Sequence, residues 1–403
     1  MIANSRRHFL RFGTIAAGAL LLAGCMGSTL TGRDETGPLS APTGPVTSQP
    51  LDQPIGQGQV KVALLLPLSA SGNAGNVGKS MRNAAELAVA EFTNPNIQLI
   101  VKDDAGTPQG AAQAAQAALG EGAELIIGPL FAQAVQAAGQ VAKQAGKPMI
   151  AFSTDANVAS RGIYLLSFLP QSDVNRIVEY ASQNGRKTFA ALLPSNAYGT
   201  VVEGAFQEAV SRVGGRIVGL ERYPADPSQM QGAISRIAQI AASADAIFLP
   251  DAGDTVPALV KGLVAARVDT KKVMLLGSGQ WDDPRIQRDP ALAGGVYPAP
   301  DSSGWQAFAQ RYRARYGVDP VRTSTLAYDA VLLAAALTQT QGSQRFTDQV
   351  LTNASGFQGV DGIFRFRPDG QSARGLAVMQ IQADGTTRIV SPAQRAFTGA
   401  SGF

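Results

Sequence analysis

Histidine and cysteine are almost absent from this sequence. Its 403 residues include one of each, His8 and Cys25, and both lie within the first 25 positions. The rest of the chain therefore cannot build cysteine nucleophiles, Ser-His-Asp triads, zinc sites of His or Cys, disulfides or histidine pH switches. Catalysis would depend on Asp, Glu, Lys, Ser or Tyr alone, so we predict a protein that is not an enzyme and has no metal or cofactor.

A strong excess of charge of one sign is also missing. The chain has 34 basic and 30 acidic residues, but Arg6, Arg7 and Arg11 precede residue 25, so the remainder is almost neutral. This balance gives no electrostatic reason to expect a nucleic-acid partner. The hydrophobic content of 45% is enough for the buried cores of two domains of ordinary size.

The N-terminal residues have the layout of an export signal. A basic start, Ser5-Arg6-Arg7-His8-Phe9-Leu10, precedes an apolar run that is too short to span a bilayer. The run ends in Leu22-Ala23-Gly24-Cys25, which resembles the lipobox of bacterial lipoproteins, where cleavage precedes an acylated cysteine. We predict a signal peptide over residues 1–24 and lipid attachment at Cys25. The paired arginines resemble a twin-arginine signal, and the alternative is the basic start of a general secretory signal.

Residues 25–58 are predicted to form a disordered tether. The segment is rich in Gly, Ser, Thr, Pro and Gln, and its prolines interrupt both helices and strand ladders: Pro38, Pro42, Pro45, Pro50 and Pro54. With an acylated Cys25, the tether would hold the folded body on the periplasmic side of a bacterial membrane. Met26 after the cysteine, in place of aspartate, favours the outer membrane.

From residue 59 onward, apolar strands alternate with helical patterns. Strands are expected at 60–66, 97–102, 125–127, 149–152, 189–193, 217–221, 246–249 and 273–276, and helices at 78–92, 108–119, 132–144, 172–184, 198–213, 228–241 and 255–266. Nearly continuous apolar strands indicate parallel sheets that are covered by helices on both faces. The fold class is therefore α/β, with two doubly wound lobes in tandem.

The C-terminal quarter has a different pattern. Helices are expected at 303–316, 323–340 and 347–353, followed by two strands, around 364–367 and 376–382, on either side of an Asp369-Gly370 turn. We assign residues 59–169 and 300–355 to lobe 1, residues 170–299 and 356–395 to lobe 2, and 396–403 to a tail.

The order of motifs resembles the type I periplasmic binding proteins of the leucine-binding class over residues 59–390. The motifs are Pro67-Leu68-Ser69-Ala70-Ser71-Gly72, Asp103-Asp104, Ile127-Gly128-Pro129, Ser153-Thr154, Tyr198-Gly199, Ala327-Tyr328-Asp329-Ala330, Gly362-x-Phe364 and Asp369-Gly370. The resemblance implies two lobes that exchange chain at three crossovers and hold a ligand in the cleft between them. Parallel sheets present loops and helix N-termini at the carboxyl ends of their strands, which suits this cleft.

The resemblance also implies ligand contacts. In amino-acid binders of this class, three groups hold the ligand carboxylate. They are a threonine that matches Thr154, the main-chain amide at the position of Phe152, and a serine at the position of Ala132. The tyrosine and acid that hold the ammonium group fall near Ala252 and Gly279, and Asp251 could take that role. Aromatic side chains could stack on the ligand. The predicted ligand-binding residues are Ser69, Ser71, Gly72, Phe131, Ala132, Phe152, Ser153, Thr154, Tyr198, Asp251, Gln280 and Trp281.

Two functions follow from the resemblance. The amino-acid clamp is incomplete, which fits a second subgroup of this class, the lipoprotein activators of penicillin-binding proteins. The sequence resembles that subgroup in segments 150–155, 164–170 and 276–283, which implies a regulator of cell-wall synthesis. The alternative is the substrate-binding lipoprotein of an ABC transporter for amino acids, with a small polar ligand and a permease as partners. A point change in the cleft should matter most in the second case.

Overall fold

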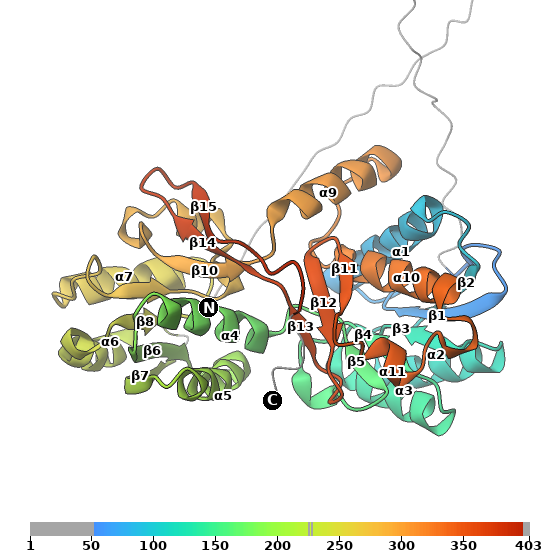
Figure 1. Ribbon diagram of the computed structural model, residues 1–403, viewed down its shortest axis with the longest axis horizontal. Coiled ribbons are helices and arrows are strands. Elements are labelled where there is room, and N and C mark those ends of the chain that lie inside the picture. The colour runs from blue at the N-terminus through green and yellow to red at the C-terminus, as the bar shows by residue number, and fades with distance from the viewer. Residues whose placement is uncertain (1–51, 225, 227–228, 398–403) are drawn as a thin grey trace, which may run out of the picture. The chain divides into compact units, whose positions relative to one another are not determined.

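The computed structural model describes residues 52–224, 226 and 229–397. The predicted signal peptide, Cys25 and most of the predicted tether lie outside the described residues, as do the last six residues of the predicted tail. Among the described helices, none is long and apolar enough to cross a membrane. The described residues from 52 onward form one compact unit that contains two lobes, each built around its own sheet (Figure 1).

Lobe 1 contains a five-stranded parallel sheet in the order β2-β1-β3-β4-β5. Its strands are β1 (Val60–Leu66), β2 (Ile97–Asp103), β3 (Leu125–Ile127), β4 (Met149–Ala151) and β5 (Ile163–Leu165). Its helices are α1 (Asn73–Glu91), α2 (Pro108–Gly120), α3 (Ala132–Gln144), α9 (Ser302–Tyr316), α10 (Ser324–Thr340) and α11 (Asp348–Leu351).

Both faces of the lobe 1 sheet are buried, as the continuous apolar strands predict. Along β1, Val62 and Leu64 join the core under α1 and α10, while Ala63 and Leu65 join the core under α2 and α3. Figure 1 shows these two helix pairs on opposite sides of the sheet. Successive residues of a strand point to opposite faces, so a strand between two helix layers must be apolar at every position.

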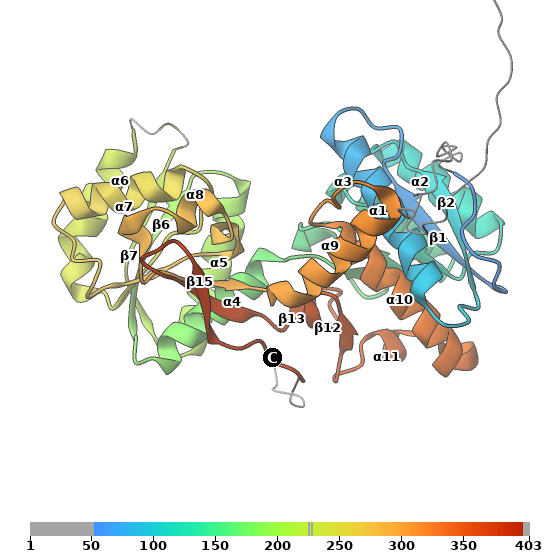
Figure 2. The ribbon, with the colours of Figure 1, turned by 90° about the horizontal axis from the view of Figure 1, so that it is seen from above.

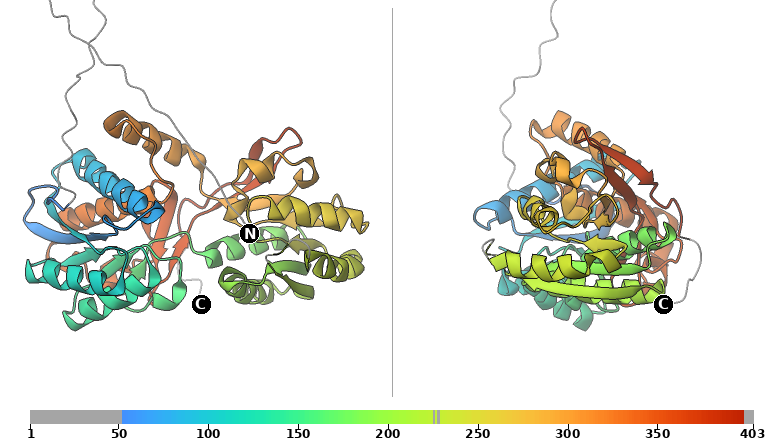
Figure 3. Two further views of the ribbon diagram at one scale, coloured as in Figure 1. Left: turned by 180° about the vertical axis from the view of Figure 1, so that it is seen from behind. Right: turned by 90° about the vertical axis from the view of Figure 1, so that its left-hand side faces the viewer.

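Lobe 2 contains a seven-stranded sheet in the order β15-β14-β10-β9-β8-β6-β7. Its strands are β6 (Thr188–Pro194), β7 (Arg216–Tyr223), β8 (Ala246–Phe248), β9 (Met274–Leu276), β10 (Val296–Ala299), β14 (Ala377–Ile381) and β15 (Thr387–Ser391). Its helices are α4 (Pro170–Gln183), α5 (Ala197–Arg212), α6 (Met230–Ile240), α7 (Thr255–Ala265) and α8 (Pro284–Gln287). The first five strands are parallel, whereas β14 and β15 add antiparallel at one edge. Helices α4 and α5 cover one face, and α6 and α7 cover the other (Figure 3).

A third sheet corrects the predicted lobe boundaries. Strands β11 (Phe357–Gly359), β12 (Gly362–Phe366) and β13 (Ser372–Arg374) form a small antiparallel sheet. Phe364 and Phe366 belong to the core of lobe 1, so this segment packs on lobe 1 and not on lobe 2. Only β14 and β15 join the second sheet. The predicted Asp369-Gly370 turn is present but connects β12 with β13, and β14 belongs to a different sheet.

The chain passes between the two lobes after β5, after β10 and after β13, in agreement with the three expected crossovers (Figure 2). Hydrogen bonds tie these segments together: Arg374 Nε donates to the carbonyl of Ser167 (3.0 Å), and Arg176 Nε donates to the carbonyl of Leu376 (2.7 Å). Beyond β15, the chain returns to lobe 1, where the Arg365 guanidinium lies 4.5 Å from the ring centroid of Phe397.

Candidate functional site

The loop after β1 is shorter than the sequence predicts. Helix α1 begins at Asn73, five residues before the predicted start at Gly78, with Gly72 at its N-cap in the left-handed region (φ 63°). The early start is possible because α1 lies against the loop: a Cβ at Gly75 would lie 2.1 Å from the Ala70 carbonyl oxygen. Ser69, Ser71 and Gly72 are exposed on this loop.

Two adjacent aspartates support the loop after β2. Asp103 is exposed, and its Oδ1 accepts the amides of Ser69 (3.2 Å) and Ala105 (2.9 Å). Burial acts to raise the pKa of Asp103, but hydrogen bonds from Ser69 and Ala105 outweigh it and lower the pKa below its ordinary value. Asp104 is 1% exposed, and burial raises its pKa to about 6. Both residues thus serve the turn, as their position at a strand end predicts.

The residues after β3 and β4 have different roles from those implied by the resemblance. The Phe152 amide donates to the Pro129 carbonyl (2.9 Å), and the Phe152 side chain is buried in the lobe 1 core, so this amide is not free for a carboxylate. Ser153 is buried, and its Oγ accepts the Asp155 amide (3.1 Å). Thr154 is exposed at the same strand end.

Phe131 and Ala132 lie where the chain enters α3. Phe131 is 38% exposed, and its ring lies against Gly106 in the loop after β2. A Cβ added at Gly106 would come within 3.2 Å of the ring, so Phe131 covers this loop. Ala132 is the first residue of α3 and is partly exposed. Lobe 1 therefore presents Ser69, Ser71, Phe131 and Thr154 at the carboxyl edge of its sheet.

In lobe 2, polar side chains from separate strand ends bond to one another. The Tyr198 hydroxyl, in the first turn of α5, donates to Ser278 Oγ after β9 (3.0 Å). The Tyr223 hydroxyl, at the end of β7, donates to Asp251 Oδ2 after β8 (2.6 Å). Asp251 Oδ1 also accepts the Ala252 amide (2.8 Å). We call Asp173, Tyr198, Tyr223, Asp251 and Ser278 the lobe 2 cluster.

Asp173 enters the cluster from α4, just beyond the first crossover. Its Oδ2 accepts the Gly279 amide (2.9 Å), and burial raises its pKa to about 7. Burial likewise raises the pKa of Tyr198 to about 12, with further contributions from the negative charges of Asp173 and Asp251. The pKa of Tyr223 is raised by burial and by Asp251. In the part of the chain that the structure describes, neither Asp173 nor Asp251 has an ion-pair partner.

Trp281 does not belong to this cluster. Its side chain is fully buried in a core of lobe 2, and its Nε1 donates to the Leu249 carbonyl (3.0 Å). The ring lies over Gly277, where a Cβ would come within 2.1 Å of it. The prediction that Trp281 stacks on a ligand is therefore wrong for this structure. Gln280, the preceding residue, is exposed and interacts with the Tyr198 side chain.

The structure thus brings together three predicted residues, Tyr198, Asp251 and Gln280, and adds three that the sequence analysis missed: Asp173, Tyr223 and Ser278. Tyr223 was missed because β7 extends two residues beyond the predicted strand. The helical pattern gives Asp173 no special role, but an acid in the first turn after a crossover lies close to the opposing strand ends. Among the described residues, no group of three or more His, Cys, Asp or Glu side chains could hold a metal ion.

Comparisons with known proteins agree with this arrangement. A family model described as "Periplasmic binding protein" matches residues 59–386. Leu/Ile/Val-binding protein homolog 6 of Brucella melitensis is 24% identical over 229 residues, and the match covers 55% of this chain and a little over half, 58%, of that relative.

Solved structures share the fold at low identity. A protein described as a branched-chain amino acid ABC transporter from Rhodospirillum rubrum superposes with a TM-score of 0.73 at 20% identity, over 82% of this chain and 99% of that one. An ABC transporter substrate-binding protein from Desulfitobacterium hafniense, in complex with Leu, gives 0.60 at 18% identity, over 82% and 99%. The chain belongs to the periplasmic binding protein family, with the type I fold of its leucine-binding class.

Proposed function

We propose that this protein is the substrate-binding component of an ABC uptake transporter and that its ligand is an amino acid. The observation that carries the proposal is the lobe 2 cluster, in which Asp173 and Asp251 approach Tyr198 and Tyr223 without any ion-pair partner in the described chain. Two carboxylates and two phenolic hydroxyls at one sheet edge suit a ligand ammonium group.

Lobe 1 supplies groups of the complementary kind. The hydroxyls of Ser69, Ser71 and Thr154 and the N-terminus of α1 are exposed at the carboxyl edge of its sheet. Hydroxyl and amide donors at a helix N-terminus favour a carboxylate. A zwitterion with its carboxylate on lobe 1 and its ammonium on lobe 2 would bind both lobes, and its preference for the closed arrangement would drive closure.

The transport function is supported better than the activator function. The relatives whose names state a role are a Leu/Ile/Val-binding protein homologue and ABC transporter proteins. The partner would then be a permease, and a lipid on Cys25 would keep the binding protein at the periplasmic face of a membrane. With the Phe152 amide engaged and Ala132 in place of a serine, a ligand carboxylate would depend on the exposed hydroxyls of lobe 1 and the N-terminus of α1.

Thermal melting of the full chain against a panel of amino acids tests the proposal. A ligand that binds only the folded state raises the melting temperature. At a hundredfold excess over its dissociation constant, it adds about 2.7 kcal/mol to the free energy of unfolding. We expect a shift with at least one amino acid and its loss in Asp251→Asn. Asp254→Asn, at an exposed position three residues later, is the matched control and should retain the shift. A panel without any shift would contradict the proposal.

A further inference from the structure

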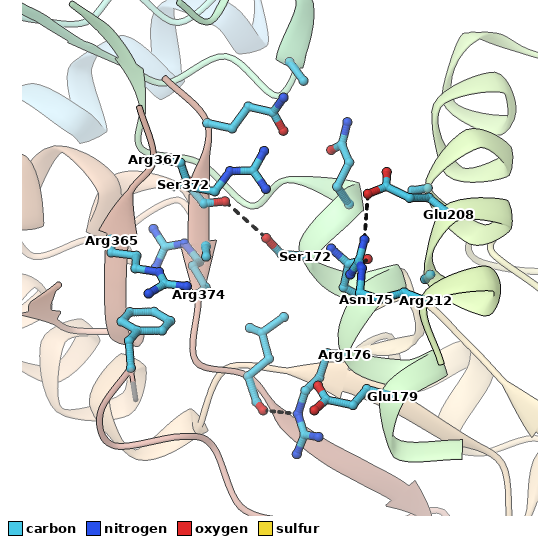
Figure 4. A pocket seen from close by; sticks show the side chains of 18 of the residues that line it. Ser172, Asn175, Arg176, Glu179, Glu208, Arg212, Arg365, Arg367, Ser372 and Arg374 are labelled. Atoms are coloured by element: carbon cyan, nitrogen blue, oxygen red, sulfur yellow. Dashed lines mark hydrogen bonds and ion pairs between the residues drawn. The ribbon is translucent and has the colours of Figure 1, made fainter. Parts of the chain in front are cut away.

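A second hollow lies away from the strand ends described above. It has a volume of about 720 Å³, within the range of about 300–1,000 Å³ that is usual for small-molecule sites. Helices α4 and α5 of lobe 2 form one side, and strands β12 and β13 of lobe 1 form the other (Figure 4). Gln394 and Phe397 of the C-terminal segment complete the lining. We call this hollow the hinge-side pocket.

The charge of the pocket lining is strongly positive. Five arginines line it against two glutamates: Arg176, Arg212, Arg365, Arg367 and Arg374, with Glu179 and Glu208. Figure 4 shows that the arginines come from both sides of the pocket. This concentration differs from the nearly balanced charge of the chain as a whole, so the excess is local.

Some of these charges are neutralised within the protein. Arg212 Nη2 pairs with Glu208 Oε1 at 2.7 Å. Arg367 Nη2 pairs with Asp369 Oδ2 at 2.6 Å. Arg212 Nη1 also donates to Asn175 Oδ1 (3.3 Å), so the charge of Arg212 is the more fully engaged of the two.

Two other arginines have no carboxylate at ion-pair distance in the described chain. Arg176 donates instead to the Leu376 carbonyl and, from Nη2, to Ser391 Oγ (2.6 Å). Arg365 donates to the Ala354 carbonyl (3.3 Å), and its guanidinium stacks on Phe397. These contacts fix the two side chains. Glu179 offsets part of the charge of Arg176 without forming an ion pair, whereas the structure gives Arg365 no carboxylate partner among the described residues, which prepares Arg365 above all to bind an anion.

Arg374 adds a buried cation at the same wall. It is 7% exposed, and its Nε donates to the Ser167 carbonyl. Its Nη1 and Nη2 have no hydrogen-bond partner among the described residues. The guanidinium lies over the rings of Phe168 and Phe364, and the negative charges of Asp361 and Asp329 offset part of its charge. Arg374 therefore adds unpaired donors to this wall more than it adds net charge.

We propose that the hinge-side pocket binds a small multivalent anion that carries carboxylate or phosphate groups. Guanidinium groups bind such oxyanions with paired, charge-assisted hydrogen bonds, and Ser172 and Asn175 add polar groups on α4. Because the arginines belong to both lobes, a bound anion restrains the lobes relative to each other. Linkage then requires that the anion and the ligand of the strand-end site change each other's affinity if they prefer different lobe arrangements.

Titration calorimetry of the full chain at low ionic strength tests the anion site, with pyrophosphate and citrate as separate probes. We expect saturable binding of at least one probe. If only one probe binds, its phosphate or carboxylate groups identify the kind of anion that the pocket prefers. Arg365→Gln should weaken binding about tenfold or more, because it removes charge-assisted hydrogen bonds. Glu208→Gln should strengthen binding severalfold, because it removes a competing carboxylate from Arg212.

The matched control is Arg388→Gln on β15, which removes the same charge at an exposed position outside the pocket. This variant should keep the affinity within about twofold, because Arg388 does not line the pocket and cannot donate hydrogen bonds to the bound anion. The stronger binding of Glu208→Gln separates a direct effect from loss of folding, because a misfolded variant would not gain affinity. Absence of saturable binding in the wild type, equal weakening by Arg388→Gln and Arg365→Gln, or no gain from Glu208→Gln would overturn the proposal.

Discussion

Two adjacent aspartates illustrate how position decides chemistry at the scale of single residues. The pKa of buried Asp104 is about 6 in the folded state, against 3.8 for the ordinary group. The folded protein therefore holds this proton more tightly than the unfolded chain, and the contribution of Asp104 to stability falls as the pH rises from about 4 to 6. In the wild type, we expect this carboxyl to lower the free energy of unfolding by about 1–3 kcal/mol between pH 4 and pH 7, and Asp104→Asn should remove that decrease. Urea unfolding at pH 4 and pH 7 measures it.

The neighbouring residue provides the opposite control. The pKa of Asp103 is lower in the folded protein than in the unfolded chain. Asp103 therefore stabilises the protein at pH values above its unfolded-state pKa, and this stabilisation is lost as the pH falls through its folded-state pKa. Asp103→Asn should therefore destabilise the protein at pH 7 and have little effect at low pH. An equal pH dependence in Asp104→Asn and the wild type would contradict the assignment of a buried, proton-binding carboxyl at this position.

Residue types at strand ends could be predicted from the sequence, but their orientation could not. The alternation of strands and helices placed Tyr198 and Asp251 at the correct edge of lobe 2. It could not show that Trp281 packs into the core over Gly277, or that the Phe152 amide bonds to Pro129, because each depends on the path of another segment. Tertiary contacts of this kind decide which strand-end groups are available to a ligand.

At the scale of elements, the position of α1 depends on close approach to the loop after β1. Gly75 is buried where a Cβ would lie 2.1 Å from the Ala70 carbonyl oxygen. We expect Gly75→Ala to destabilise the protein by about 1–3 kcal/mol, since α1 or the loop must move. Gly204→Ala, in the exposed middle of α5 with free space around it, should stabilise by about 0.5–1 kcal/mol. Denaturant unfolding compares the two, and equal effects would show that the approach of α1 is not tight.

Elements with a strong period could be predicted, whereas those fixed by distant partners could not. Helix α3 begins and ends at the predicted residues, and β1 does the same. Strand β10 was missed because Pro298 interrupts its pattern, although its pairing with β14 tolerates that proline. The sheet of β11–β13 was assigned to the wrong lobe because its sequence does not show which core Phe364 and Phe366 enter.

At the scale of the whole molecule, the predicted lipid anchor separates membrane attachment from folding. Cys25 lies far in sequence from β1 and outside the described body. We expect Cys25→Ala to leave the melting temperature of the body unchanged and to release the protein from membranes, because acylation would be lost. Fractionation of cells that express each form measures the effect. Membrane association that resists washing in Cys25→Ala would contradict the anchor.

The measurement that tests the central claim most directly is a calorimetric titration of the full chain with L-leucine and, in parallel, with 4-methylpentanoate. The two ligands share their side chain and carboxylate, and only leucine has an ammonium group. If the lobe 2 cluster holds that group, leucine binds with a saturable heat. The analogue then binds at least about a hundredfold more weakly, because it cannot make the charge-assisted hydrogen bonds to the two carboxylates. Equal binding of the two ligands would contradict an ammonium site built on Asp173 and Asp251, and no saturable binding of either would contradict a site for leucine.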